Sequence, residues 1–341
     1  IFTGEGDDLD GSVPLDAKGL WGGLIILGNA PINTSTGEGS IEGIPISEPR
    51  GIYGGNNEDD NSGILQYVSI RHGGTNIGED NEINGLTLGG VGRKTTIDHI
   101  EVISNADDGI EFFGGTVNCS NLAVGLCGDD AFDFDEGYKG KCQFMFAYVN
   151  NQTGNHAAEH NGAPVAYGAE FYSRPVLYNC TYIGSGNEDS EYLITFDNNS
   201  EGIYRNSVFV NNKKGIAIEI NPYENCFDNI ENEKLILENN VFFDIEKNQP
   251  DSIFSAYPVS VSLSTEESYL ANYFSSQQNL IDNTGIGIIG ETINVLPATT
   301  VFSDMAAYDH PWFEEVSYKG AFGSRNWLEE WSAMWEYGLI R

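Results

Sequence analysis

Basic residues are scarce in this sequence. Its 341 residues include 16 lysines and arginines against 51 aspartates and glutamates, which gives a net charge of −35. Proteins that bind nucleic acid neutralise phosphates with lysine and arginine, so we exclude nucleic acid as a partner. The same charge disfavours adhesion to anionic membranes. The acidity instead indicates solubility in a salty exterior or carboxylates neutralised by bound divalent cations.

Long apolar runs and paired cysteine motifs are also missing. No stretch is apolar enough to cross a bilayer, so we predict no transmembrane segment. The five cysteines show no CxxC motif and no zinc-ligand spacing. Cys119 and Cys142 are expected on the same strand of neighbouring coils, where either a disulfide or two buried thiols would fit. The 41 glycines indicate many tight turns rather than long helices.

Two carboxylate-rich segments repeat at a fixed distance. Residues 107–112 read Asp-Asp-Gly-Ile-Glu-Phe, and residues 129–134, 22 positions later, read Asp-Asp-Ala-Phe-Asp-Phe. A glycine-bounded, strand-like repeat of this length is typical of one turn of a parallel β-solenoid. We therefore predict an all-β, right-handed parallel β-helix with a minimal coil of about 22 residues, long loops and a C-terminal helical cap.

Alternating apolar residues predict two series of strands along the chain. One series covers 65–70, 97–102, 121–124, 144–146, 180–183, 207–210 and 240–243, and the other 86–88, 110–112, 132–134, 193–196 and 216–220. In the second series, Leu86, Ile110 and Phe132 should stack into an apolar ladder. Asn105, Asn179, Asn206 and Asn239 fall near coil corners, where asparagine suits left-handed turns.

The two ends of the chain differ from the repeats. We divide one continuous domain into N-terminal coils and loops (1–60), a β-helix core (61–262) and final coils with a cap (263–341). Residues 264–278 predict a short helix. Residues 326–335 place apolar side chains at helical spacing, which predicts a helix over the open end of the solenoid.

Stacking brings like charges together. Adjacent strands lie about 4.8 Å apart, where two carboxylates repel by about 1 kcal/mol in water and more where the dielectric constant is low. A bound cation, retained protons or nearby lysines could each relieve this repulsion. Hard oxygen ligands favour calcium among cations. The predicted metal ligands are Asp107, Asp108, Glu111, Asp129, Asp130 and Asp133.

The same residues allow a catalytic interpretation. Residues 105–108 (Asn-Ala-Asp-Asp), 128–130 (Gly-Asp-Asp) and 154–156 (Gly-Asn-His) resemble, in order and spacing, the motifs of polygalacturonases, which are β-helical glycoside hydrolases. The resemblance implies cleavage of a polysaccharide with Asp108, Asp129, Asp130 and His156 as catalytic residues. Paired carboxylates would act as general acid and water-activating base. The chain lacks the family's second glycine after the histidine and its Arg-x-Lys segment.

A zinc-protease pattern competes for one of these histidines. Residues 156–160 read His-Ala-Ala-Glu-His, which fits the inverted H-x-x-E-H motif. That chemistry requires a helix, and the flanking glycine, asparagine and proline residues leave barely one turn. A polar loop over the solenoid face is the preferred interpretation.

Sequence segments spread over most of the chain resemble those of a group of exported, largely uncharacterised cell-surface proteins of bacteria with type IX secretion. The matching segments include 21–32, 69–74, 81–90, 107–115 and 318–322. The resemblance implies display outside the cell, as part of a longer protein. We expect a secreted or cell-surface, calcium-binding β-helix that acts as a structural, adhesive or glycan-contacting module. The alternative is a polysaccharide hydrolase or lyase, and the sequence leaves the glycan, other partners and oligomeric state open.

Overall fold

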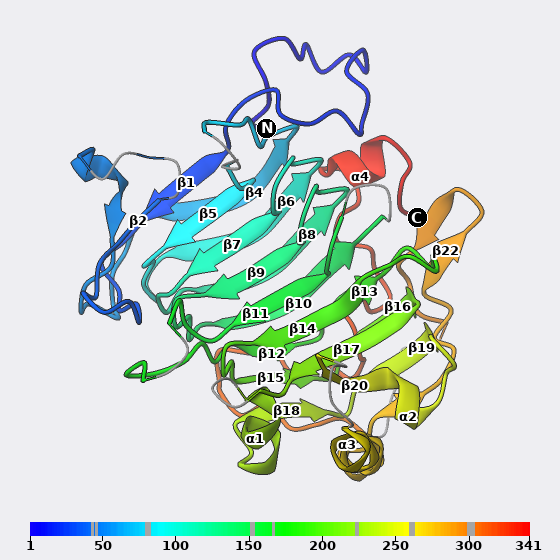
Figure 1. Cartoon of the computed structure of the whole chain (residues 1–341). Coiled ribbons are helices and arrows are strands. Elements are labelled where there is room, and N and C mark those ends of the chain that lie inside the picture. Colours follow the sequence, from blue (N-terminus) through cyan, green and yellow to red (C-terminus); the bar gives the residue numbers. More distant parts are fainter. Residues whose placement is uncertain are drawn as a thin grey trace.

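A computed structural model describes the chain except for residues 42–43, 45–46, 79–82, 151–153, 166–167, 222–224, 259–262 and 299–303. Within the described residues, the chain winds into coils whose strands form one eight-stranded and one eleven-stranded sheet (Figure 1). Neighbouring strands in both sheets are parallel. The all-β, parallel β-helix predicted from the repeat is confirmed.

The eight-stranded sheet contains one short strand from each coil. Its order is β1 (Leu24–Leu27), β5 (Leu86–Gly89), β7 (Ile110–Phe113), β9 (Phe132–Asp135), β11 (Ala158–Asn161), β14 (Tyr192–Asp197), β17 (Lys214–Glu219) and β20 (Phe254–Tyr257). Its inward-facing side chains stack in register, so Leu86, Ile110 and Phe132 form the predicted ladder. All three are fully buried.

The eleven-stranded sheet begins with long strands and continues with pairs of short ones. It contains β4 (Ile64–Arg71), β6 (Thr96–Ile103), β8 (Asn118–Gly125), β10 (Lys141–Tyr148), β12 (Val176–Tyr178), β13 (Thr181–Ile183), β15 (Gly202–Arg205), β16 (Val208–Asn212), β18 (Leu235–Glu238), β19 (Val241–Ile245) and β21 (Leu280–Ile281). The first part of β10 pairs with β12 and the last part with β13. The sheet is therefore bent along a line that crosses every coil.

Left-handed residues lie along this line. Positive φ angles occur at Tyr67, His99, Asn121, Phe144, Asn179, Asn206 and Asn239. The prediction of left-handed asparagines is confirmed at Asn179, Asn206 and Asn239. It is wrong at Asn105, because the neighbouring Ser104 takes that conformation instead. The predicted 22-residue spacing holds from Ile100 to Leu122, but Leu122 then pairs with Met145 and not with Phe144.

The remaining elements are small. They are β2 (Gly39–Ser40), β3 (Ile52–Tyr53), the hairpin of β22 (Gly287–Ile289) and β23 (Thr292–Asn294), a 3-10 turn (Pro49–Gly51), and helices α1 (Cys226–Glu231), α2 (Pro250–Ile253), α3 (Ser264–Ser276) and α4 (Ala333–Glu336). None of the described cysteines forms a disulfide and all are buried, including Cys119 and Cys142, which are partners in register.

The C-terminal helix is shorter than the sequence predicts and does not cover the last coil. The expected helix over 326–335 is reduced to α4, which contacts β6 near the first coils (Figure 1). Residues 304–341 run back along the outer face of the eleven-stranded sheet. At the last coil, α3 packs against β20 through Tyr273 and Phe274. The end of the solenoid is therefore covered by α3, because its apolar face is the one that meets the last strand.

Candidate functional site

The site is built on the turns that lead into β7, β9 and β11. Gly128 allows one turn to approach the turn of the preceding coil, since a Cβ atom there would lie 1.8 Å from the Ala106 carbonyl oxygen. Asn105 fixes that preceding turn by donating from Nδ2 to the carbonyl oxygens of Ile83 (3.0 Å) and Asp108 (2.8 Å). The acidic residues that follow are thus held on rigid, stacked turns.

Each turn is tied to the next by a carboxylate. Asp108 Oδ1 accepts a hydrogen bond from the backbone N–H of Asp130 at 2.9 Å. Asp130 Oδ1 accepts from the backbone N–H of His156 at 2.6 Å and lies 2.9 Å from His156 Nδ1. Asp108, Asp130 and His156 therefore occupy equivalent positions in three consecutive coils. The predicted stacking of Asp108 on Asp130 is confirmed.

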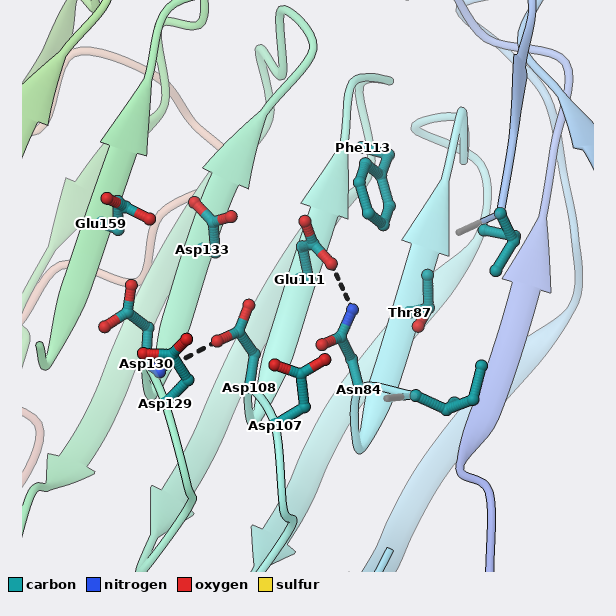
Figure 2. Close-up of a pocket in the computed structure, with 12 residues that line it drawn as sticks. Asn84, Thr87, Asp107, Asp108, Glu111, Phe113, Asp129, Asp130, Asp133 and Glu159 are labelled. Carbon is teal, nitrogen blue, oxygen red and sulfur yellow. Dashed lines mark hydrogen bonds between the residues drawn. The ribbon is translucent and has the colours of Figure 1, made fainter. Parts of the chain in front are cut away.

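A second row of carboxylates lies on the strands themselves. Glu111 on β7, Asp133 on β9 and Glu159 on β11 are partners in register and point away from the core (Figure 2). Glu111 and Asp133 are nevertheless buried, with 8% and 7% of their surface exposed. Asn84 Nδ2 donates to Glu111 Oε2 at one end of the row. Asp133 Oδ1 is buried and has no hydrogen-bond partner in the described structure.

The carboxylates of the two rows line one acidic pocket of about 180 Å³, and His156 lies beside it through its contact with Asp130. No lysine or arginine is among the described residues that line it. Three groups of side chains offer ligand atoms within 4.8 Å of one another. These groups are Asp107, Asp108 and Asp129; Asp108, Glu111 and Asp133; and Asp130, His156 and Glu159. All six predicted metal ligands thus lie in or beside the pocket, although a bound metal stays a prediction.

Burial and mutual repulsion favour the protonated forms of Asp108, Glu111 and Glu159. Burial, reinforced by the charge of Asp130, raises the pKa of Asp108 well above its ordinary value. Burial and the charge of Asp133 do the same to the pKa of Glu111. The pKa of Glu159 is raised to about 8 by burial and then by Asp130. Burial lowers the pKa of His156, but its contact with Asp130 outweighs this effect and raises the pKa overall.

The zinc-protease pattern is divided between two sides of a strand. Residues 158–161 form β11 and not the loop that the sequence predicts. His160 points into the core, where its ring stacks between Phe134 (4.7 Å between centroids) and Phe196 (4.5 Å). His156 and Glu159 remain on the outside. The two histidines therefore cannot bind one metal ion, because the strand places them on opposite sides.

The four predicted catalytic residues do meet, at a spacing shorter than the mechanism of an inverting glycosidase requires. Asp108 and Asp130 are buried, Asp129 is exposed, and His156 contacts Asp130. An inverting glycosidase needs carboxyl groups about 6.5–9.5 Å apart to admit a water molecule. The oxygens offered by Asp108 and Asp129 lie within 4.8 Å of each other. This closeness suits a shared cation better than an intervening water.

Sequence reasoning missed Glu159 as part of the site. It lies 26 residues after Asp133 because the intervening loop is longer than in the preceding coil, so the 22-residue interval passes over it. The signal available was its place in the motif at 156–160, whose glutamate faces outward once the segment forms a strand. Asn84, which contacts Glu111, was also missed.

The fold and the site together define a parallel β-helix with an acidic pocket on the outer face of one sheet. A family model described as a pectate-lyase-like β-helix domain matches residues 12–279. The chain therefore belongs to the pectate-lyase-like β-helix family, which is a carbohydrate-related family of proteins. No curated protein and no solved structure matches the sequence. Within the described residues, no helix has both the length and the apolar character needed to cross a membrane.

Proposed function

We propose that this protein is an extracellular or cell-surface β-helix that binds calcium in the acidic pocket and contacts polysaccharide as a structural or adhesive module. The observation that carries the proposal is Asp133 Oδ1, which is buried in an acidic pocket without a hydrogen-bond partner in the described structure. Buried polar atoms normally have a partner. A cation would supply it.

The donor set fits calcium. The ligands would be Asp107, Asp108, Glu111, Asp129, Asp130 and Asp133. All are hard oxygen donors, which calcium prefers over softer ligands. When bound, calcium would neutralise the facing carboxylates and offer further coordination positions to sugar oxygens. Membership of a carbohydrate-related family supports polysaccharide as the partner, and the resemblance to type IX export supports display on the cell surface.

Calcium titration after chelation tests the site. We expect calcium to raise the melting temperature of the protein and to give a saturable binding heat. Asp133→Asn should lose most of this response. In chelator the same variant should be more stable than the native protein by roughly 1–2 kcal/mol, because a neutral amide removes like-charge repulsion. The matched control is Asp8→Asn, which changes an exposed aspartate outside the pocket. A native protein whose melting temperature ignores calcium would contradict the proposal.

Polysaccharide cleavage is the second candidate function. The contact between His156 and Asp130 favours it, because a histidine held by a carboxylate can transfer protons. Incubation with a polysaccharide panel, with and without calcium, should separate the two functions. Retention of glycan without new reducing ends or unsaturated products supports the binding module. New products would instead establish an enzyme, and their loss in Asp129→Asn would place the cleavage at the site of Asp108, Asp129, Asp130 and His156.

A further inference from the structure

The end of the acidic pocket at β11 differs chemically from the rest. Here Asp130, His156 and Glu159 offer one imidazole nitrogen and two carboxylate oxygens within 4.8 Å of one another. The other two groups in the pocket contain only carboxylates. Imidazole is a preferred ligand of zinc and related transition metals, whereas calcium is bound by oxygen.

We propose that Asp130, His156 and Glu159 form a second cation site that selects a divalent transition metal such as zinc. It shares Asp130 with the proposed calcium site but does not depend on calcium binding there. Three protein ligands of the histidine and carboxylate type leave one position of a tetrahedral zinc ion open. A water molecule or a sugar oxygen could occupy that position.

Backbone hydrogen bonds hold the segments that carry these three side chains. The turn that carries His156 is tied to the preceding coil, since Ala131 N donates to the His156 carbonyl oxygen at 2.9 Å and Asn155 N to the Asp129 carbonyl oxygen at 3.1 Å. Glu159 is held by the pairing of β11 with β9. Little rearrangement is therefore needed to bring the three ligand atoms around one ion.

A second observation at this end of the pocket points to a cation. Asp133 is the register partner of Glu159, and the two carboxylates lie side by side above Asp130 in Figure 2. Asp133 Oδ1 is buried without a hydrogen-bond partner in the described structure. The pairing of His156 with Asp130 explains one polar contact here but leaves this oxygen unpaired.

Zinc titration of protein without a histidine tag, after chelation and then saturation with calcium, tests the proposal. We expect one zinc ion to bind per chain. His156→Ala and Glu159→Gln should each weaken zinc binding by at least about tenfold, and each should weaken zinc binding by a larger factor than it changes calcium affinity. Cobalt offers a spectroscopic readout, because its visible absorption should change when the imidazole ligand is lost. His310→Ala is the control, since His310 is exposed and far from these ligands in the sequence.

Each outcome separates this site from the calcium site. Equal zinc affinity in the native protein and both variants would overturn the proposal, as would zinc binding that calcium abolishes. If His156→Ala fails to fold, as judged by its circular dichroism, Glu159→Gln carries the test. A native protein that binds zinc through His156 but gives no calcium response would refute only the proposed calcium site.

Discussion

The outer faces of the two sheets have opposite chemistry. The outer face of the eight-stranded sheet carries Glu111, Asp133 and Glu159 in one row beside a pocket. The outer face of the eleven-stranded sheet is covered by residues 304–341, with contacts such as the edge-to-face pair of Phe146 and Phe322 at 5.4 Å. One face stabilises the fold, while the other keeps repelling charges together. Such an arrangement is expected where charges serve binding or chemistry.

The covering segment is attached differently at its two ends. Near the last coils, left-handed asparagines hold its backbone, because Asn239 donates to the Asp304 carbonyl oxygen and Asn206 makes two bonds to Ala306. Near the first coils, the left-handed positions are occupied by aromatic residues, and these contact the covering segment through their rings. The rings of Tyr67 and His99 contact each other and both contact Trp331. Bulky residues with positive φ are strained, so the aromatic contacts offset a cost that asparagine largely avoids.

The largest effect is expected at the buried carboxylate that fastens this segment. Glu101 is fully buried on β6 and accepts hydrogen bonds from the backbone N–H groups of Ala333 and Met334, both at 2.8 Å. It also neighbours Arg71, which is 2% exposed. Glu101→Ala should therefore lower the free energy of unfolding by about 3–5 kcal/mol, because a buried charge and two donors lose their partner. Urea unfolding measures this loss.

The matched control for this variant is Glu315→Ala, which removes an exposed glutamate from the same segment. Its stability should stay within about 0.5 kcal/mol of the native protein. Equal losses in the two variants would mean that the covering segment contributes little through Glu101. The contrast between a fastened face and a bare face would then lose its main support.

A smaller effect is expected inside the eight-stranded sheet, directly behind the acidic row. Burial among Phe134, Phe196 and the Tyr204 hydroxyl lowers the pKa of His160 to about 3, against an ordinary value of 6.5. Below pH 6.5 the unfolded chain binds a proton that the folded chain does not, so stability falls as the pH falls. The loss is about 1.4 kcal/mol per pH unit.

His160→Phe isolates this contribution, because phenylalanine cannot titrate and the carboxylates are common to both proteins. Between about pH 6.5 and 4, the native protein should lose about 3 kcal/mol more than the variant. Urea unfolding at several pH values gives the two slopes. Parallel slopes would contradict this prediction, because they would show that the folded chain protonates His160 as readily as the unfolded chain does.

The sequence predicts repeating contacts well and contacts with the C-terminal segment poorly. The alternation of apolar residues predicts the strands, and the 22-residue interval places Glu111 beside Asp133. Glu159 escaped because a longer loop breaks the interval. The hydrogen bond between Glu101 and Met334 joins residues 233 positions apart, and no local sequence pattern around either residue predicts it. A sequence period predicts the contacts that each coil makes with its neighbour. The segment that crosses many coils is not part of the repeat, so no period predicts its contacts.

The smallest expected effect tests how the asparagines hold the covering segment. Asn206 Oδ1 accepts from the Ala306 N–H at 2.8 Å, and Nδ2 donates to the Ala306 carbonyl oxygen at 3.0 Å. Asn206→Gly keeps the left-handed backbone accessible but removes both bonds. Asn121→Gly makes the same change at a left-handed position whose side chain has no hydrogen bond to this segment within the described residues. The backbone effect of glycine is common to both variants, so the difference between them reports the bonds, at about 1–2 kcal/mol.

Hydrogen exchange distinguishes a local from a global origin of that difference. If the asparagines hold the segment, Asn206→Gly should speed exchange around Ala306 while amides of β9 and β11 keep their protection, because opening of one attached segment leaves the coils intact. Equal exchange in the two glycine variants would place the attachment in the aromatic contacts near the first coils. The covering segment would then depend on strained aromatic residues, and the asparagines would serve only to turn the chain.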